Sequence, residues 1–307
     1  MNSSINEFRN NRTDYTVTAP VSMIFAVTSV IITSFILIIV LFTKPLHTVT
    51  RLLTCNTCLA SILYCVVQFN NYIYLLVLTW DRNDQSCRWR GYFGYLAMVA
   101  FIYSYVLQVL SRFFFIVLST KYRWLTSFRT HFYLIFIGWI IIFIIPLPAI
   151  LTNDIYFREG ELCWVTKEYE LHSYYITIAY YVIPILSIIV INVMISMRIY
   201  RYRKNSRIQR HTRRKDRDIE IFRNIMISFS VYFLGGVPFI IYMFTDSEFL
   251  YSMGVISVTF AVTIEKLVII HLDRDIRMTL KNCFCQKRTQ VTPITINPTF
   301  LAHRLNI

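Results

Sequence analysis

The residues best suited to chemistry are two adjacent charges, Glu265 and Lys266, in a stretch of otherwise uncharged residues. A charge in apolar surroundings is costly, so such residues usually bind ions, carry protons or pair with another charge. Because neighbouring residues of a helix do not face each other, we expect Glu265 and Lys266 to have different partners. Two interpretations follow. Either Glu265 faces other helices as a cation or proton site, or it is merely neutralised or hydrogen-bonded while Lys266 extends to the nearest surface.

The chain has none of the sequence patterns that are typical of an enzyme. Ser/His/Asp spacings, His-x-x-x-Asp arrays and phosphate-binding glycine loops are missing, so we predict no catalytic residue and no cofactor. Cys55 and Cys58 are close in sequence but lack further ligands, so we predict no metal site.

The elements that must position these residues are membrane helices. The 307 residues are 56% hydrophobic and only 16% charged, which is far more apolar than a soluble domain. Seven runs are long and uncharged enough to cross a bilayer as helices, the last one interrupted by the charged pair. These runs are 21–43, 52–80, 91–111, 132–153, 173–197, 224–245 and 249–270.

The distribution of Lys and Arg predicts how the helices are oriented, because cytoplasmic flanks carry the excess of positive charge. With the N-terminus outside, 23 of the 31 basic residues fall in inner segments and 11 of these lie between Arg198 and Arg223. We therefore predict an extracellular segment 1–19, with glycosylation sequons at Asn2 and Asn11, and a cytoplasmic tail 286–307. The net charge of +14 follows mostly from this asymmetry, so we expect no nucleic acid partner.

The cysteines divide according to this orientation. Cys87 and Cys163 are the two predicted outside the membrane, in oxidising surroundings, so we expect them to form a disulfide. Cys283 and Cys285 follow an amphipathic stretch, 273–284, that is expected to lie along the inner membrane surface. They are predicted palmitoylation sites, with free cytosolic thiols as the alternative.

Seven residues at mutually consistent spacings resemble the rhodopsin-like (class A) G protein-coupled receptor family: Trp80, Cys87, Arg112, Trp139, Cys163, Pro184 and Pro238. The resemblance extends from Thr33 to about Cys285. It implies an all-α membrane protein, a seven-transmembrane helix bundle over residues 20–285 that includes a short amphipathic eighth helix, 273–284. It also implies a receptor at the plasma membrane that binds an extracellular ligand between its helices and activates heterotrimeric G proteins by outward movement of the sixth helix.

The resemblance assigns the switch to Arg112, which stands in Ser111-Arg112-Phe113 where the family has Asp-Arg-Tyr. Asp218, at the inner start of the sixth helix, is expected to pair with Arg112 and hold the receptor closed. Alternatively, Asp218 only offsets its basic neighbours on a solvated face. Pro238 removes one backbone hydrogen bond and so predicts the bend of the sixth helix.

Several positions depart from the family pattern and concern the same switch. Ser61 stands where the second helix usually has an aspartate, and we expect Glu265 to supply the missing carboxylate near it. The other departures are Asn192, Gly236, Lys266 and Ile269.

The ligand is indicated mainly by exclusion. Gly94 replaces the aspartate of amine receptors, and Thr259 lies where opsins have their retinal lysine, so neither ligand is expected. Acidic residues predominate in the outer loops and favour a cationic peptide. Residues expected to line an apolar outer cavity, unless they serve ordinary packing, are Tyr95, Met98, Tyr180, Phe239, Met243 and Thr259.

The competing function is an ion or proton channel or transporter that uses Glu265 and Lys266. Transporters commonly contain internal repeats with matched helix breaks. We find no repeat in this chain, so the receptor is favoured.

Overall fold

The computed structural model of the protein describes residues 15–42, 48–77, 83–119, 121–152, 154–157, 162–165, 169–205, 213–245, 247–273 and 276–280. These residues form helices joined by short connections, without a strand among them. The longer α-helices are α2 (Tyr15–Phe42), α3 (Val49–Leu76), α4 (Asp84–Phe113), α5 (Phe128–Ile144), α8 (Ile183–Asn205), α9 (Arg213–Thr245) and α10 (Glu248–Leu272). The shorter elements are the π-helix η2 (Phe114–Leu118), the 3-10 helix η3 (Arg123–Thr126), α6 (Leu147–Leu151), α7 (Glu170–Thr177) and the π-helix η4 (Ile178–Val182).

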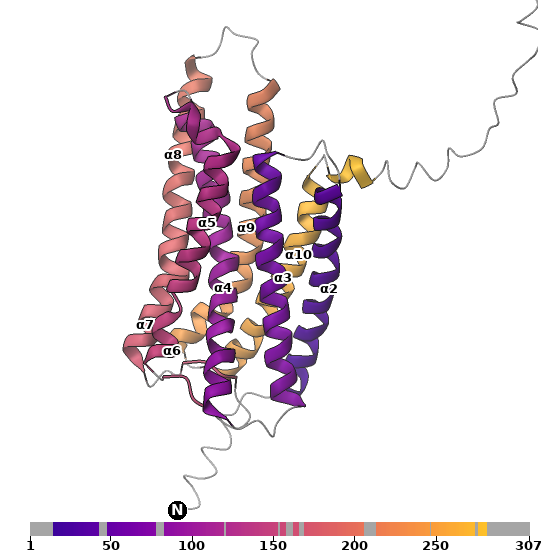
Figure 1. Cartoon of the computed structure of the whole chain (residues 1–307), viewed down its shortest axis with the longest axis vertical. Helices are drawn as coiled ribbons and strands as arrows, with labels where there is room; N and C mark the ends of the chain where they lie inside the picture. The colour runs from indigo at the N-terminus through magenta and orange to yellow at the C-terminus, as the bar shows by residue number, and fades with distance from the viewer. Residues whose placement is uncertain are drawn as a thin grey trace, which may run out of the picture.

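Seven helical spans are long and apolar enough to cross a membrane, as the sequence predicts. They run side by side along the long axis of the molecule (Figure 1). The start of α2 and the α6–α7 region lie at one end, which we call the N-terminal end. The end of α8 and the start of α9 lie at the opposite end, which we call the C-terminal end. The protein is therefore a multi-pass membrane protein with a seven-helix bundle.

The core of the bundle is organised around α4. This helix is buried along nearly its whole length, from Cys87 to Arg112, and contacts α3, α5, α8 and α9. Its aromatic side chains make edge-to-face contacts across the bundle, such as Phe101 with Tyr232 of α9 at 4.8 Å between ring centroids. By contrast, α5 buries only His131 and Ile142, because most of its apolar side chains face outward, where lipid would surround them.

Helices α9 and α10 approach each other closely at Gly235. A Cβ atom added to Gly235 would lie 2.4 Å from the Cβ of Ala261, so only glycine fits there. The hydroxyl of Ser257 donates to the carbonyl of Gly235 at 2.6 Å. Three residues further on, Pro238 interrupts the backbone hydrogen bonds of α9. Gly235 thus has a packing role beside the predicted hinge.

A π-helical turn, η4, joins α7 to α8 inside one membrane span. The hydroxyl of Tyr103 on α4 donates to the backbone carbonyl of Ala179 within this turn at 3.0 Å. A wider turn displaces backbone carbonyls from the regular ladder, and Tyr103 supplies a partner for one of them.

The helix boundaries differ in places from those expected. Helix α2 begins at Tyr15, before the first predicted membrane run, and α10 continues through the charged pair to Leu272. Asp273 has an extended backbone and caps α10, and the described residues 276–280 that follow it are helical. Of the predicted amphipathic helix 273–284, residues 274–275 and 281–284 lie outside the described residues, so an eighth helix over this whole range stays a prediction. Asn2, Asn11, Cys283, Cys285 and the tail 286–307 also lie outside the described residues.

Candidate functional site

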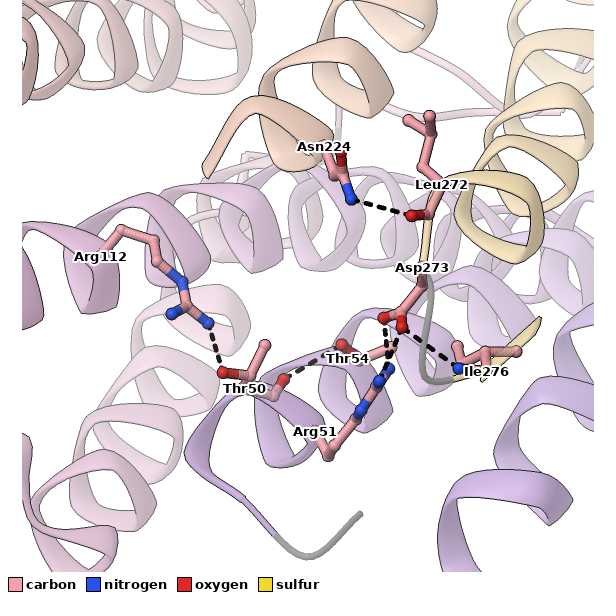
Figure 2. Close-up of polar contacts among 8 residues, drawn as sticks. All are labelled: Thr50, Arg51, Thr54, Arg112, Asn224, Leu272, Asp273 and Ile276. Carbon is pink, nitrogen blue, oxygen red and sulfur yellow. Dashed lines mark hydrogen bonds and ion pairs between the residues drawn. The ribbon is translucent and has the colours of Figure 1, made fainter. Parts of the chain in front are cut away.

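A bidentate ion pair joins two helices at the C-terminal end of the bundle. The guanidinium of Arg51, in the first turn of α3, donates from Nη1 to Oδ2 of Asp273 and from Nη2 to Oδ1 at 2.7 Å. Arg51 is 5% exposed and Asp273 26%. The planar fork of an arginine matches a carboxylate in this way, which makes the pair directional as well as charged. Figure 2 shows the pair and its neighbours.

Asp273 also organises the chain that follows α10. Its Oδ1 accepts a hydrogen bond from the backbone N–H of Ile276 at 3.2 Å, at the start of the helical residues 276–280. One residue earlier, the carbonyl of Leu272 accepts from Nδ2 of Asn224 on α9 at 3.2 Å (Figure 2). The end of α10 is therefore held by α3 on one side and by α9 on the other.

Arg112, the predicted switch residue, lies beside this cluster. It is 2% exposed, and its Nη2 donates to Oγ1 of Thr50 at 2.5 Å. The carbonyl of Thr50 in turn accepts from Oγ1 of Thr54 at 3.0 Å. The predicted pairing of Arg112 with Asp218 stays a prediction, because the side chain of Asp218 lies outside the described residues.

Two consecutive residues of α3, Thr50 and Arg51, thus reach α4 and the end of α10 (Figure 2). No sequence pattern singled out Thr50, Arg51 or Asp273 as site residues. The available signal was one basic and one acidic residue at helix ends predicted on the same side of the membrane. We define these residues, together with Arg112 and Asn224, as the C-terminal network.

The second charged feature is the pair Glu265–Lys266 near the middle of the bundle. The expectation of different partners is wrong: Nζ of Lys266 lies 2.7 Å from Oε2 of Glu265, and both side chains are 0% exposed. The side chains of adjacent helix residues leave the backbone in diverging directions, but these two side chains are long enough to bend toward each other. Attraction is strong where no water screens it. The alternative expectation, that Lys266 extends to the surface, is also wrong because its side chain is fully buried.

The surroundings of this pair leave its charges incompletely compensated. Neither carboxylate oxygen of Glu265 nor Nζ of Lys266 has a hydrogen bond of good geometry among the described residues. The ammonium of Lys266 lies 5.5 Å from the centre of the Phe101 ring, a cation–π contact. The charges of the pair also act on the buried thiols of Cys58 and Cys65 on α3. Ser61 lies between these thiols and donates to the carbonyl of Thr57.

The N-terminal end of the bundle is held by a covalent link. Cys87 in the first turn of α4 forms a disulfide with Cys163 in the connection between α6 and α7, with a Cα–Cα distance of 5.4 Å. Gly91, one turn later, permits this approach, because an added Cβ would lie 2.5 Å from the carbonyl oxygen of Cys163. The link fixes the described residues 162–165 against α4.

The residues expected to line a ligand cavity lie near this connection but are largely packed. Tyr95, Met98, Tyr180 and Thr259 are each less than 10% exposed. The hydroxyl of Tyr95 accepts from the backbone N–H of Val165 at 2.9 Å. Phe239 is half-buried against Tyr251, while the side chain of Met243 lies outside the described residues.

A third ion pair lies at the N-terminal end. Nδ1 of His172 on α7 is 2.7 Å from Oδ2 of Asp154 and 3.4 Å from Oγ1 of Thr152. Burial alone would raise the pKa of Asp154. Hydrogen bonds with His172 and Thr152 and the charge of His172 outweigh burial and hold this pKa below its ordinary value of 3.8.

Comparison with known families agrees with the arrangement of the helices. Residues 33–281 match the family model described as 7 transmembrane receptor (rhodopsin family). The matched region contains all the paired residues described above. No curated protein matched the chain. Since the family model covers most of the sequence and the structure has seven membrane-length helices, the chain belongs to the rhodopsin family of seven-transmembrane receptors.

Proposed function

We propose that the protein is a G protein-coupled receptor of the plasma membrane with its N-terminal end outside and its C-terminal network facing the cytosol. The family is one of receptors, which in general bind an extracellular ligand and a G protein. The excess of basic residues in the segments predicted to be cytosolic supports this orientation. Membrane lipids surround the exposed apolar faces, and the acidic outer loops favour a cationic peptide ligand.

The observation that carries the proposal is the pair of adjacent residues Thr50 and Arg51, which link Arg112 of α4 to the end of α10. An arginine at the cytosolic end of a receptor helix must be released before it can contact a G protein. One of its hydrogen bonds is donated to the neutral hydroxyl of Thr50, a contact that can be exchanged for another acceptor. The C-terminal network therefore fits a closed, resting arrangement.

Opening would proceed through α9. This helix contains Pro238, and among its described residues Asn224 donates to the carbonyl of Leu272 while Met226 accepts from Asn192 of α8. Bending at Pro238 would move Asn224 away from α10, while the tighter Arg51–Asp273 pair would keep α3 and α10 together. We assign the switch to Arg112, Asp218, Asn224 and Pro238, with Glu265 buried behind it.

The test is ligand-free nucleotide exchange on a panel of G protein α subunits. Wild type, Asp218→Ala, Asn224→Ala and Arg112→Ala are compared in the same membranes at equal surface expression. We expect Asp218→Ala and Asn224→Ala to raise basal exchange on at least one subunit and Arg112→Ala to abolish it. Thr28→Ala, on the face of α2 away from the core, is the control. Exchange that stays absent in every form would contradict the proposal.

Among the described residues, Glu265 and Lys266 make no hydrogen bond of good geometry, which favours one second candidate, an ion or proton path through the bundle. Their contact with each other speaks for a neutral unit instead. The candidates separate when purified protein is placed in liposomes under a proton or sodium gradient. If the protein conducts ions or protons, flux should appear and Glu265→Gln should remove it. If it is a receptor alone, the flux should not exceed that of protein-free liposomes.

A further inference from the structure

One indole ring from a loop fills space at the N-terminal end of the bundle. Trp164 follows the disulfide-bonded Cys163, and its ring meets the ring of Tyr95 edge-to-face with 4.7 Å between centroids. Carbon atoms of the same indole lie 3.8 and 3.9 Å from where a Cβ of Gly94 would be. Trp164 also packs against both the buried cluster around α4 and the smaller one around Tyr72. The partly buried ring therefore contacts both clusters of the core.

The backbone of the loop is held independently of this ring. The disulfide fixes Cys163 to α4, and the N–H of Val165 donates to the hydroxyl of Tyr95 at 2.9 Å. These contacts lie on either side of Trp164 in the sequence and do not involve the indole. The indole can leave its place by side-chain rotation while both anchors persist.

The walls of the site suit an aromatic ring. Tyr95 presents a ring for an edge-to-face contact, and behind it Tyr95 meets the ring of Tyr180 at 5.7 Å. Gly94 offers a backbone surface without a side chain, and beside it Nδ2 of Asn71 lies 3.4 Å from the position of an added Cβ. The neighbouring cluster adds apolar side chains, including Val255 and partly buried Phe239. Such walls bind a flat apolar group with specific geometry but offer few groups that would select a charged one.

We propose that this is an aromatic-ring binding site, occupied by the chain's own Trp164 when no ligand is bound. It rests on the proposed receptor function and specifies its ligand: a cationic peptide that presents a Trp, Tyr or Phe side chain, whose ring replaces the indole. The peptide's positive charge is attracted to acidic residues at the same end, among them Asp84, Asp154 and Glu170.

The test uses Trp164→Ala in full-length protein in nanodiscs with 3-methylindole, the analogue of the missing side chain, as the probe. Apolar cavities made by truncation can bind the lost ring from solution. We expect saturable binding, seen as a rise in the unfolding temperature, about tenfold tighter than to wild type. Trp89→Ala is the matched control, because Trp89 is 48% exposed on the outer face of α4 and its removal leaves no enclosed site. Equal shifts in the two variants would overturn the proposal.

A second measurement applies if Trp164→Ala does not fold. Wild type is labelled with 5-fluorotryptophan, and the fluorine resonance of Trp164 is assigned by its loss in Trp164→Phe. Millimolar 3-methylindole should shift this resonance and leave that of Trp89 unchanged. An unchanged Trp164 resonance would overturn the proposal. Both readouts are independent of G proteins, so a ring site without nucleotide exchange would refute only the receptor function.

Discussion

The chain contains the same chemistry, a carboxylate paired with a cation, in two different geometries. Arg51 and Asp273 are 222 residues apart and join α3 to the end of α10. Glu265 and Lys266 are neighbours on α10 and pair within that one helix. The first pair depends on how two helices are placed, whereas the second keeps its partners at any placement of α10.

The difference shows that burial alone does not tell what an ion pair does. Glu265–Lys266 is the more buried pair, yet its ion pair lies within α10 and neutralises two charges inside the membrane, while Lys266 reaches α4 through its cation–π contact with Phe101. Arg51–Asp273 is partly exposed, but its two hydrogen bonds define the position of α10 relative to α3. A helix-positioning role belongs to the less buried pair.

The largest effect is expected from breaking the buried pair. Lys266→Met leaves the Glu265 carboxylate without its counter-charge in the membrane, which should cost about 3 kcal/mol of stability. The double variant Glu265→Gln/Lys266→Met should recover most of this loss, because no charge is then buried alone. Chemical unfolding in nanodiscs measures both. If the double variant is as unstable as Lys266→Met, the pair does more than neutralise charge.

Breaking the pair between helices should have a smaller effect on stability but a larger one on geometry. Arg51→Ala is expected to cost about 2 kcal/mol, since Asp273 is partly exposed and keeps access to water. A spin-label distance between the ends of α3 and α10 should broaden in this variant and stay unchanged in Lys266→Met. The exchanged variant Arg51→Asp/Asp273→Arg should narrow it again. If the α3–α10 distance is the same in wild type and Arg51→Ala, Arg51 does not position α10.

Salt provides a milder test of the same comparison. Exposed charges are screened by ions, with a Debye length of about 3 Å at 1 M salt, and buried ones much less. The stability difference between wild type and Arg51→Ala should therefore shrink from low to 1 M sodium chloride. The difference between wild type and Lys266→Met should stay constant. Equal salt dependence in the two cases would show that the mid-membrane pair is reached by solvent.

The smallest effect is expected at the third pair, Asp154–His172, and depends on pH. The pKa of Asp154 is lowered by folding. The carboxylate therefore contributes stability above its unfolded pKa, and this contribution is lost as pH falls through the lower, folded pKa. Unfolding measured between pH 6 and pH 2 should show a difference between wild type and Asp154→Asn that is constant above about pH 4 and shrinks as the pH falls further. A difference that is unchanged between pH 6 and pH 2 would contradict this assignment.

The sequence predicted the membrane helices and the family well, because each span must be apolar throughout to satisfy its backbone in lipid. It did not predict the C-terminal network. Arg51 and Asp273 meet only because α3 and α10 are neighbours at that end, and side-chain reach across helices is not encoded in a local pattern. The pairing of Glu265 with Lys266 was also missed. Helix periodicity describes where side chains leave the backbone, and not where long side chains end in surroundings without water.

The position of Trp164 could not be predicted from the sequence pattern, because it also depends on contacts between distant parts of the chain. Its place in the core follows from the disulfide and from Gly91, which together bring a loop against α4. Tyr95 was predicted to face a cavity, and the structure fills the adjacent space with the indole of the same chain.

The π-helical turn Ile178–Val182 sets how the two ends of its membrane span are rotated relative to each other. Such a turn holds one residue more than a regular α-helical turn, so it rotates the residues before it relative to those after it. Deleting one residue here would turn Glu170–Thr177 by about 100° relative to α8. His172 would then no longer face Asp154, and Tyr103 would lose its acceptor at Ala179. One residue therefore sets the rotation of Glu170–Thr177 relative to α8 within this membrane span.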